Sequence, residues 1–307
     1  MSATLIKFTI SIGVMVLVFW WADGAKVLQH LSSLSVDWIV LSVVALTVAT
    51  FSMARRWQIV AAHLGLRLRY GVALREYYLG SLVNQVLPGG VTGDVARAVR
   101  ARHDADIRTA GLSVALERFL GQIAIFVTLG LGLAVALVLP GGIAWPQITW
   151  ALPLGVSSLA VLGLLFLNGD GAIPRFARHG KRLQARPELI LHGALSCACL
   201  IFAFYACARA AGTAIPPTGW ATLVPLVLCA MLVPLSIGGW GWREGAAAAL
   251  FPLIGAAPSA GVAAGLTYGS TCLLAALPAL LILLAQSLTN PNLTVPHRGP
   301  SCPNPPT

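Results

Sequence analysis

The chain is dominated by apolar runs of about 20 residues, the length that a helix needs to cross the hydrocarbon core of a bilayer. Runs of sufficient length cover residues 5–21, 37–54, 112–139, 150–167, 189–211, 220–237 and 260–286. Lipid-exposed backbone must satisfy its own hydrogen bonds, and helices do so within one segment. The pattern therefore predicts an all-α, polytopic membrane protein with about seven spanning helices.

The composition supports lipid as the main solvent. Hydrophobic residues make up 57% of the chain and charged residues only 10%, whereas soluble domains carry about 25% charged residues. The net charge of +10 comes from short basic clusters between the apolar runs, which is typical of cytoplasmic loops rather than of nucleic-acid binding. We expect one membrane domain over residues 1–288 and a disordered, proline-rich cytoplasmic tail over 289–307.

The positions of the basic clusters predict the orientation. Clusters at 55–75, 97–108 and 175–186 fall on one side if the first span runs outward. The positive-inside rule then places both termini in the cytoplasm, in a bacterial inner membrane. Because 55–75 and 97–108 share a side, the segment 77–96 must enter and leave on that side as a re-entrant hairpin. The short apolar stretch at 246–256 is predicted to be a second re-entrant or broken helix, since 11 residues reach only about half-way across.

A glycine-rich turn lies at the centre of the first hairpin. Pro88 ends the incoming half-helix because it cannot continue the hydrogen-bond ladder. The turn and the helix after it bring together Asn84, Gly89, Gly90, Gly93, Asp94, Arg97 and Arg100. Two interpretations remain open. The segment is either a capped tight turn with snorkelling arginines, or an anion site in which helix N–H groups and guanidinium groups bind phosphate.

A second glycine-rich break precedes a charged pair in the C-terminal half. It contains Gly238 and Gly239, followed by Arg243 and Glu244. The pair is either a self-compensating interfacial ion pair or an intramembrane functional site. Paired broken helices in the two halves of a chain indicate a transporter site, and a loose internal repeat is a further expectation.

Glu117 and Arg118 form the third charged constellation, at the start of a long apolar run. They lie either at the cytoplasmic interface or inside the membrane, where Arg243 and Glu244 are the expected partners. The sequence has no HExxH, GxSxG, CxxC or Walker motif, and its histidines have no metal-ligand spacing. We therefore expect no enzyme activity, no cofactor and no metal.

The order of these motifs resembles a known family. Arg55-Arg56-Trp57, the segment from Tyr77 to Arg97, Glu117-Arg118 and the segment from Ile237 to Glu244 follow one another along the chain. This order is similar to that of the lysylphosphatidylglycerol synthase transmembrane-region family, also called flippase-like, over residues 5–286. The family's motifs map onto Asn84, Pro88, Gly93, Asp94, Arg97, Glu117, Arg118, Gly238, Gly239, Arg243 and Glu244.

The resemblance implies movement of a lipid between leaflets, without the aminoacyl transfer that a fused synthase domain performs in some members. We expect Arg97 and Arg243 to bind the headgroup phosphate, and Asp94 and Glu244 to bind its cationic or hydroxyl parts. The expected partners are the bilayer and a lipid or lipid-linked substrate, with no nucleic acid. Two alternatives stay open: a membrane-embedded transferase acting on a polyprenyl-linked sugar, and a non-catalytic partner of a cytoplasmic enzyme.

Overall fold

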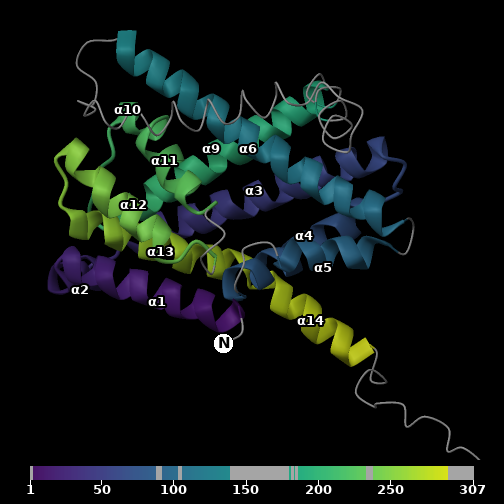
Figure 1. Cartoon of the computed structure of the whole chain (residues 1–307), viewed down its shortest axis with the longest axis horizontal. Coiled ribbons are helices and arrows are strands. Elements are labelled where there is room, and N and C mark those ends of the chain that lie inside the picture. Colours follow the sequence, from purple (N-terminus) through teal and green to yellow (C-terminus); the bar gives the residue numbers. More distant parts are fainter. Residues whose placement is uncertain are drawn as a thin grey trace, which may run out of the picture.

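The computed structural model describes residues 3–87, 92–102, 106–138, 180, 183, 186–232 and 238–289. Throughout this part of the chain the regular structure is helical, with no strand (Figure 1). The helices are α1 (Ala3–Trp21), α2 (Gly24–Ser32), α3 (Val36–His63), α4 (Tyr70–Val86), α5 (Thr92–Ala101), α6 (Ile107–Val138), α9 (Pro187–Ala210), α10 (Pro217–Trp220), α11 (Leu223–Ala230), α12 (Trp242–Leu250), the 3-10 helix η3 (Phe251–Ile254), α13 (Pro258–Ala276) and α14 (Pro278–Thr289).

Four helical segments are long and apolar enough to cross a membrane: α3, α6, α9 and the continuous pair α13–α14. A fifth is formed if α1 and α2, which meet at an angle of 91°, count as one broken span. The all-α membrane class is therefore confirmed. The predicted span at 150–167 lies outside the described residues.

The run at 220–237, predicted to be one spanning helix, is interrupted instead. Helix α10 ends at Trp220, and α11 ends at Ala230 after only 8 residues. Thr222 leaves the helical backbone with φ −120° and ψ −69°, and its hydroxyl donates a hydrogen bond to the Thr218 carbonyl at 2.7 Å. The segment before the break, Pro217–Trp220, is less apolar than α11 after it, so the described apolar helix is shorter than the predicted run.

Helices α11 and α12 fold back on each other as a helical hairpin. Gly238, Gly239 and Gly241, between the two helices, have φ of +54°, +83° and +88°. L side chains rarely adopt this region, so glycine is the residue that permits the reversal. A Cβ on Gly239 would lie 2.8 Å from Cγ of Met231, which immediately follows α11. The second glycine-rich break is thus a hairpin tip.

Helices α4 and α5 form the first hairpin, as predicted for residues 77–96. Asn84 Oδ1 accepts a hydrogen bond from the Gly93 amide at 2.7 Å. Further from the tip, Glu76 pairs with Arg100, so the two helices are antiparallel. The side of the membrane on which this hairpin opens remains a prediction.

The two hairpins enter the bundle from opposite ends (Figure 1). The α4–α5 hairpin lies at the end where α3 finishes and α9 begins. The α11–α12 hairpin lies at the other end, where the Ser35 amide before α3 donates to the Ala210 carbonyl at the end of α9. Their tips meet, because a Cβ on Gly238 would lie 2.8 Å from Gln85 Oε1 and 3.1 Å from Gln85 Cα. Opposed hairpins of this kind are what an inverted repeat produces.

Helix α13 supports the second hairpin through three glycines spaced four residues apart. A Cβ on Gly261 would lie 2.5 Å from the Ala247 carbonyl oxygen, and one on Gly265 would lie 3.2 Å from Glu244 Cα. A Cβ on Gly269 would collide with the guanidinium group of Arg243. Residues four apart share one helix face, so the glycine stripe allows α12 and its charged pair to approach α13 closely.

Candidate functional site

Helices α3, α5 and α6 bring five charged side chains together beside the first hairpin. We call this set the charged network: Arg56, Asp94, Arg97, Glu117 and Arg118. Arg56 Nη2 lies 2.6 Å from Glu117 Oε1, and Arg97 Nη2 lies 2.9 Å from Glu117 Oε2. Asp94 pairs with Arg97 at 3.1 Å and also with Arg118. Each carboxylate is therefore shared by two arginines, and the network carries a formal charge of +1.

Burial makes these pairings energetically important. Glu117 has no exposed surface, and Arg97 and Arg56 are only 1% and 3% exposed. Moving a charge out of water costs several kcal/mol unless partners compensate it. Arg118 is the member that reaches the outside, with 38% of its side chain exposed. The network thus extends from the buried interior to the surface of the protein.

Arg97 is held at the centre between two aromatic rings. Its guanidinium carbon lies 4.7 Å from the centroid of Trp57 and 4.5 Å from that of Tyr77. Tyr77 donates to Glu117 at 3.3 Å, and the Trp57 indole donates to Ser113 at 3.1 Å, so both rings are fixed in place. Cation–π contacts of this kind are strongest where water is excluded. Arg97 is therefore held in place from both sides, in the middle of the helix that follows the tip.

Asn84 and Arg100 lie on the hairpin but outside this central cluster. Asn84 binds the Gly93 amide and donates to Asp94 Oδ2 at 3.4 Å, which links α4 to the start of α5. Arg100 is 40% exposed and pairs with Glu76 rather than with the Arg97 cluster. The two arginines that the sequence places on one face therefore face different environments.

The second hairpin carries the Arg243–Glu244 pair. Arg243 Nε donates to Glu244 Oε1 at 3.0 Å, while Glu244 Oε2 accepts from the Gly241 amide at 2.6 Å. Both side chains are fully buried. The Arg243 guanidinium also lies 4.8 Å from the Trp240 ring and 5.6 Å from the Tyr268 ring. The pair is self-compensating, as the interfacial interpretation requires, but it is buried, as the functional interpretation requires.

The predicted pairing of Glu117 with Arg243 and Glu244 is wrong. Glu117 pairs with Arg56 and Arg97, because α6 packs against α3 and α5. Sequence reasoning identified Arg56 only as part of a family motif, and did not assign Glu76 or Tyr77 to the site. One feature of the sequence could have identified Arg56: it lies within a helix that continues an apolar run without a break. An arginine in such a position must find a buried acid.

The structure describes one of the three glycines of the first turn. Gly89 and Gly90 lie outside the described residues. Gly93 is helical, and a Cβ there would collide with the Gly80 carbonyl oxygen. Glycine is needed at position 93 because the backbones of α4 and α5 approach each other closely there, and not because of an unusual dihedral angle.

This contact yields a stability prediction. Gly93→Ala should destabilise the protein by about 1–3 kcal/mol, because α4 and α5 must separate to admit the methyl group. Gly130→Ala in α6 is the matched control, since nothing lies within 4 Å of its Cβ position and alanine favours a helix by about 0.5–1 kcal/mol. Thermal unfolding in detergent should move the two melting temperatures in opposite directions, and a Gly93→Ala curve identical to wild type would remove the proposed constraint.

Four buried polar atoms on the hairpin helices have no hydrogen-bond partner among the described residues: Gln85 Oε1, Arg97 Nε, Trp242 Nε1 and Arg243 Nη1. Buried polar atoms are nearly always bonded, so these atoms are capable of binding a polar ligand. Within the same residues no group of three His, Cys, Asp or Glu side chains is placed to hold a metal ion. The described site residues offer hydrogen bonding and charge, supplied mainly by arginine.

Comparison with models of protein families identifies a family. The family model described as the lysylphosphatidylglycerol synthase TM region matches residues 5–281. No curated protein matches the chain. The match includes the charged network, both hairpins and the helices that carry them. The chain therefore belongs to the lysylphosphatidylglycerol synthase TM region family.

Proposed function

We propose that this protein moves a phospholipid or a lipid-linked precursor between the two leaflets of a bacterial inner membrane. The observation that carries the proposal is the contact between the two opposed hairpin tips, at Gln85 and Gly238. Irregular backbone at membrane depth is tolerated where it is buried in protein or lines a polar path. Membership of a membrane-lipid family supports the same conclusion.

The headgroup would pass where the tips meet, while its acyl chains stay in the bilayer. Buried arginines stand on both sides of this point: Arg97 follows the first tip and Arg243 follows the second. Guanidinium groups bind phosphate through paired hydrogen bonds. A lipid phosphate can therefore replace a carboxylate as the partner of Arg97 without leaving a charge uncompensated. Asp94, which keeps Arg118 as a partner, would then be available to bind hydroxyl or amine groups of the headgroup, and Glu244 would be available in the same way where phosphate binds Arg243.

In the described conformation this exchange has not occurred. Arg97 is occupied by Asp94 and Glu117, and Arg243 by Glu244. Ion pairs that hold a closed state and reopen around a ligand are a common way to couple binding to conformational change. We assign the described arrangement to such a closed state, with the basic end of the bundle in the cytoplasm as the positive-inside rule favours.

Substitution of Arg97 by lysine tests the proposal. Lysine keeps the charge but lacks the planar fork that binds phosphate at two points. In liposomes containing a fluorescent anionic lipid, Arg97→Lys should slow transfer between leaflets about tenfold, equivalent to about 1.4 kcal/mol. Transfer is scored as the fluorescence that becomes accessible to an impermeant quencher. Arg108→Lys is the matched control, because Arg108 is exposed at the start of α6, and it should transfer lipid like wild type.

Two results would redirect the assignment. Wild-type transfer in correctly inserted Arg97→Lys would place the lipid path elsewhere. Conversion of a labelled polyprenyl-linked sugar donor by the purified protein would favour the membrane-embedded transferase instead.

A further inference from the structure

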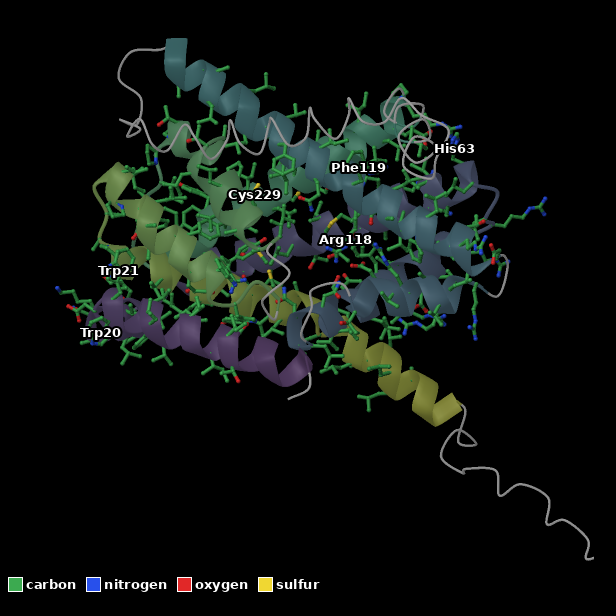
Figure 2. The ribbon with its side chains drawn as sticks, in the orientation of Figure 1. Trp20, Trp21, His63, Arg118, Phe119 and Cys229 are labelled. Carbon is green, nitrogen blue, oxygen red and sulfur yellow. The ribbon has the colours of Figure 1, made fainter. Side chains whose placement is uncertain are left out.

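A basic cleft of about 740 Å³ opens at the end of the bundle where α3 finishes. Figure 2 labels His63, the last residue of that helix. The cleft has two walls: Arg55 and the α3–α4 connection with Arg67 and Arg69 form one, and Arg186, just before α9, belongs to the other. This basic cleft is separate from the charged network, since none of the five network side chains lines it.

The arginines of the basic cleft are largely uncompensated. Glu188 is the acid that lines it, so four arginines leave a formal charge of +3. Among the described residues, no carboxylate forms an ion pair with Arg67, Arg69 or Arg186, and all three are exposed. Neighbouring Arg56, by contrast, is buried and paired with Glu117. The basic cleft therefore holds guanidinium groups that form no ion pair with a carboxylate among the described residues. An anion is the ligand that such groups bind most strongly.

The apolar floor indicates what kind of anion. Ile59, Leu66 and Leu68 also line the cleft, Ile59 and Leu66 are buried, and Ile59 belongs to a helix long and apolar enough to span the bilayer. The cleft is therefore amphipathic and lies where a span ends, at the depth of lipid headgroups. Basic pockets between membrane helices on the cytoplasmic side bind anionic headgroups, and a volume of 740 Å³ is typical of small-ligand sites.

We propose that the basic cleft is a binding site for the phosphate headgroup of an anionic phospholipid. The arginines bind the phosphate oxygens, and the apolar floor packs against the glycerol and the first part of the acyl chains. The site does not depend on the proposed function, because binding here requires no passage between the hairpin tips.

The test compares two double variants that each remove two exposed arginines from the basic part of the chain. Arg67→Gln/Arg186→Gln takes one arginine from each wall, while Arg102→Gln/Arg108→Gln leaves the cleft intact. Each protein is purified in nanodiscs of phosphatidylglycerol and phosphatidylcholine, and the lipid retained after release is counted by native mass spectrometry. We expect retained phosphatidylglycerol to fall about tenfold in the cleft variant and less than about twofold in the control.

A second arm identifies the source of the phosphate. Inorganic phosphate and glycerol phosphate, added at millimolar concentration, should leave the retained phosphatidylglycerol unchanged, because they lack the apolar part. Displacement by either would show that the cleft binds soluble phosphate compounds and would overturn the lipid assignment. Equal losses in the two double variants, or no loss in the cleft variant, would overturn the site itself.

Discussion

Replacing Glu117 by glutamine should lower the free energy of unfolding by about 3–5 kcal/mol, the usual cost of breaking a buried ion pair on one side. Glutamine keeps the shape of the side chain but removes the charge that compensates both Arg56 and Arg97. Glu117 has no exposed surface, so water cannot take its place. The melting temperature in detergent should fall by roughly 6–20 °C.

Glu188→Gln is the control for that measurement, because Glu188 is an exposed acid at the start of α9. Its loss should cost less than about 1 kcal/mol. The double variant Arg56→Met/Glu117→Met should lower the free energy of unfolding by less than the sum of its single variants, because it removes both members of one ion pair. A Glu117→Gln protein as stable as wild type would mean that the charged network is hydrated rather than dry.

Arg243→Ala and Glu244→Ala should each cost about 3–5 kcal/mol, and the double variant should cost clearly less than their sum. Arg243→Ala leaves the Glu244 carboxylate with the Gly241 amide as its remaining partner among the described contacts. Glu244→Ala leaves a buried guanidinium between the rings of Trp240 and Tyr268. Differential scanning fluorimetry in detergent measures all three variants.

The chain supplies a matched pair for this experiment. Arg75 and Glu76 are also adjacent on a helix and ion-paired at 3.1 Å, but Arg75 is 44% exposed. Glu76 is buried but also pairs with Arg100, so Arg75→Ala leaves no unpaired acid and should cost about 0–1 kcal/mol, as for a pair with an exposed member. Equal shifts of the melting temperature for Arg75→Ala and Arg243→Ala would show that burial does not increase the contribution of the Arg243–Glu244 pair to stability.

The parts of this fold that the sequence predicts are those set by local chemistry. Span-length apolar runs, a proline after a short helix and clustered glycines are each readable in one segment, so α3, α6, α9 and the α4–α5 reversal could be anticipated. The interruption in the 220–237 run was missed, because a window of span length averages Ala221 and Thr222 with the strongly apolar residues after them.

The sequence did not predict which residues from distant segments pair with each other. Glu117 has several arginines available along the chain, and only the packing of α6 against α3 and α5 selects Arg56 and Arg97. Gly93 shows the same limit, since its partner Gly80 lies on the opposing helix. A residue pattern reveals that a buried charge or a glycine needs a partner, but the tertiary fold decides which partner it meets.

Cross-linking the two hairpin tips tests the central claim most directly. The Cβ position of Gly238 lies 3.1 Å from Gln85 Cα, close enough for a disulfide between cysteines at the two positions. With the six native cysteines replaced, Gln85→Cys/Gly238→Cys should form this bond on oxidation, whereas Gln85→Cys/Gly212→Cys should not. Each single variant controls for the cysteine itself. We predict that the cross-linked protein in liposomes transfers no fluorescent lipid. Reduction should restore transfer to the level of the Gly238→Cys variant, in which a side chain has to adopt φ +54°. Undiminished transfer by fully cross-linked protein would contradict a lipid path between the hairpin tips.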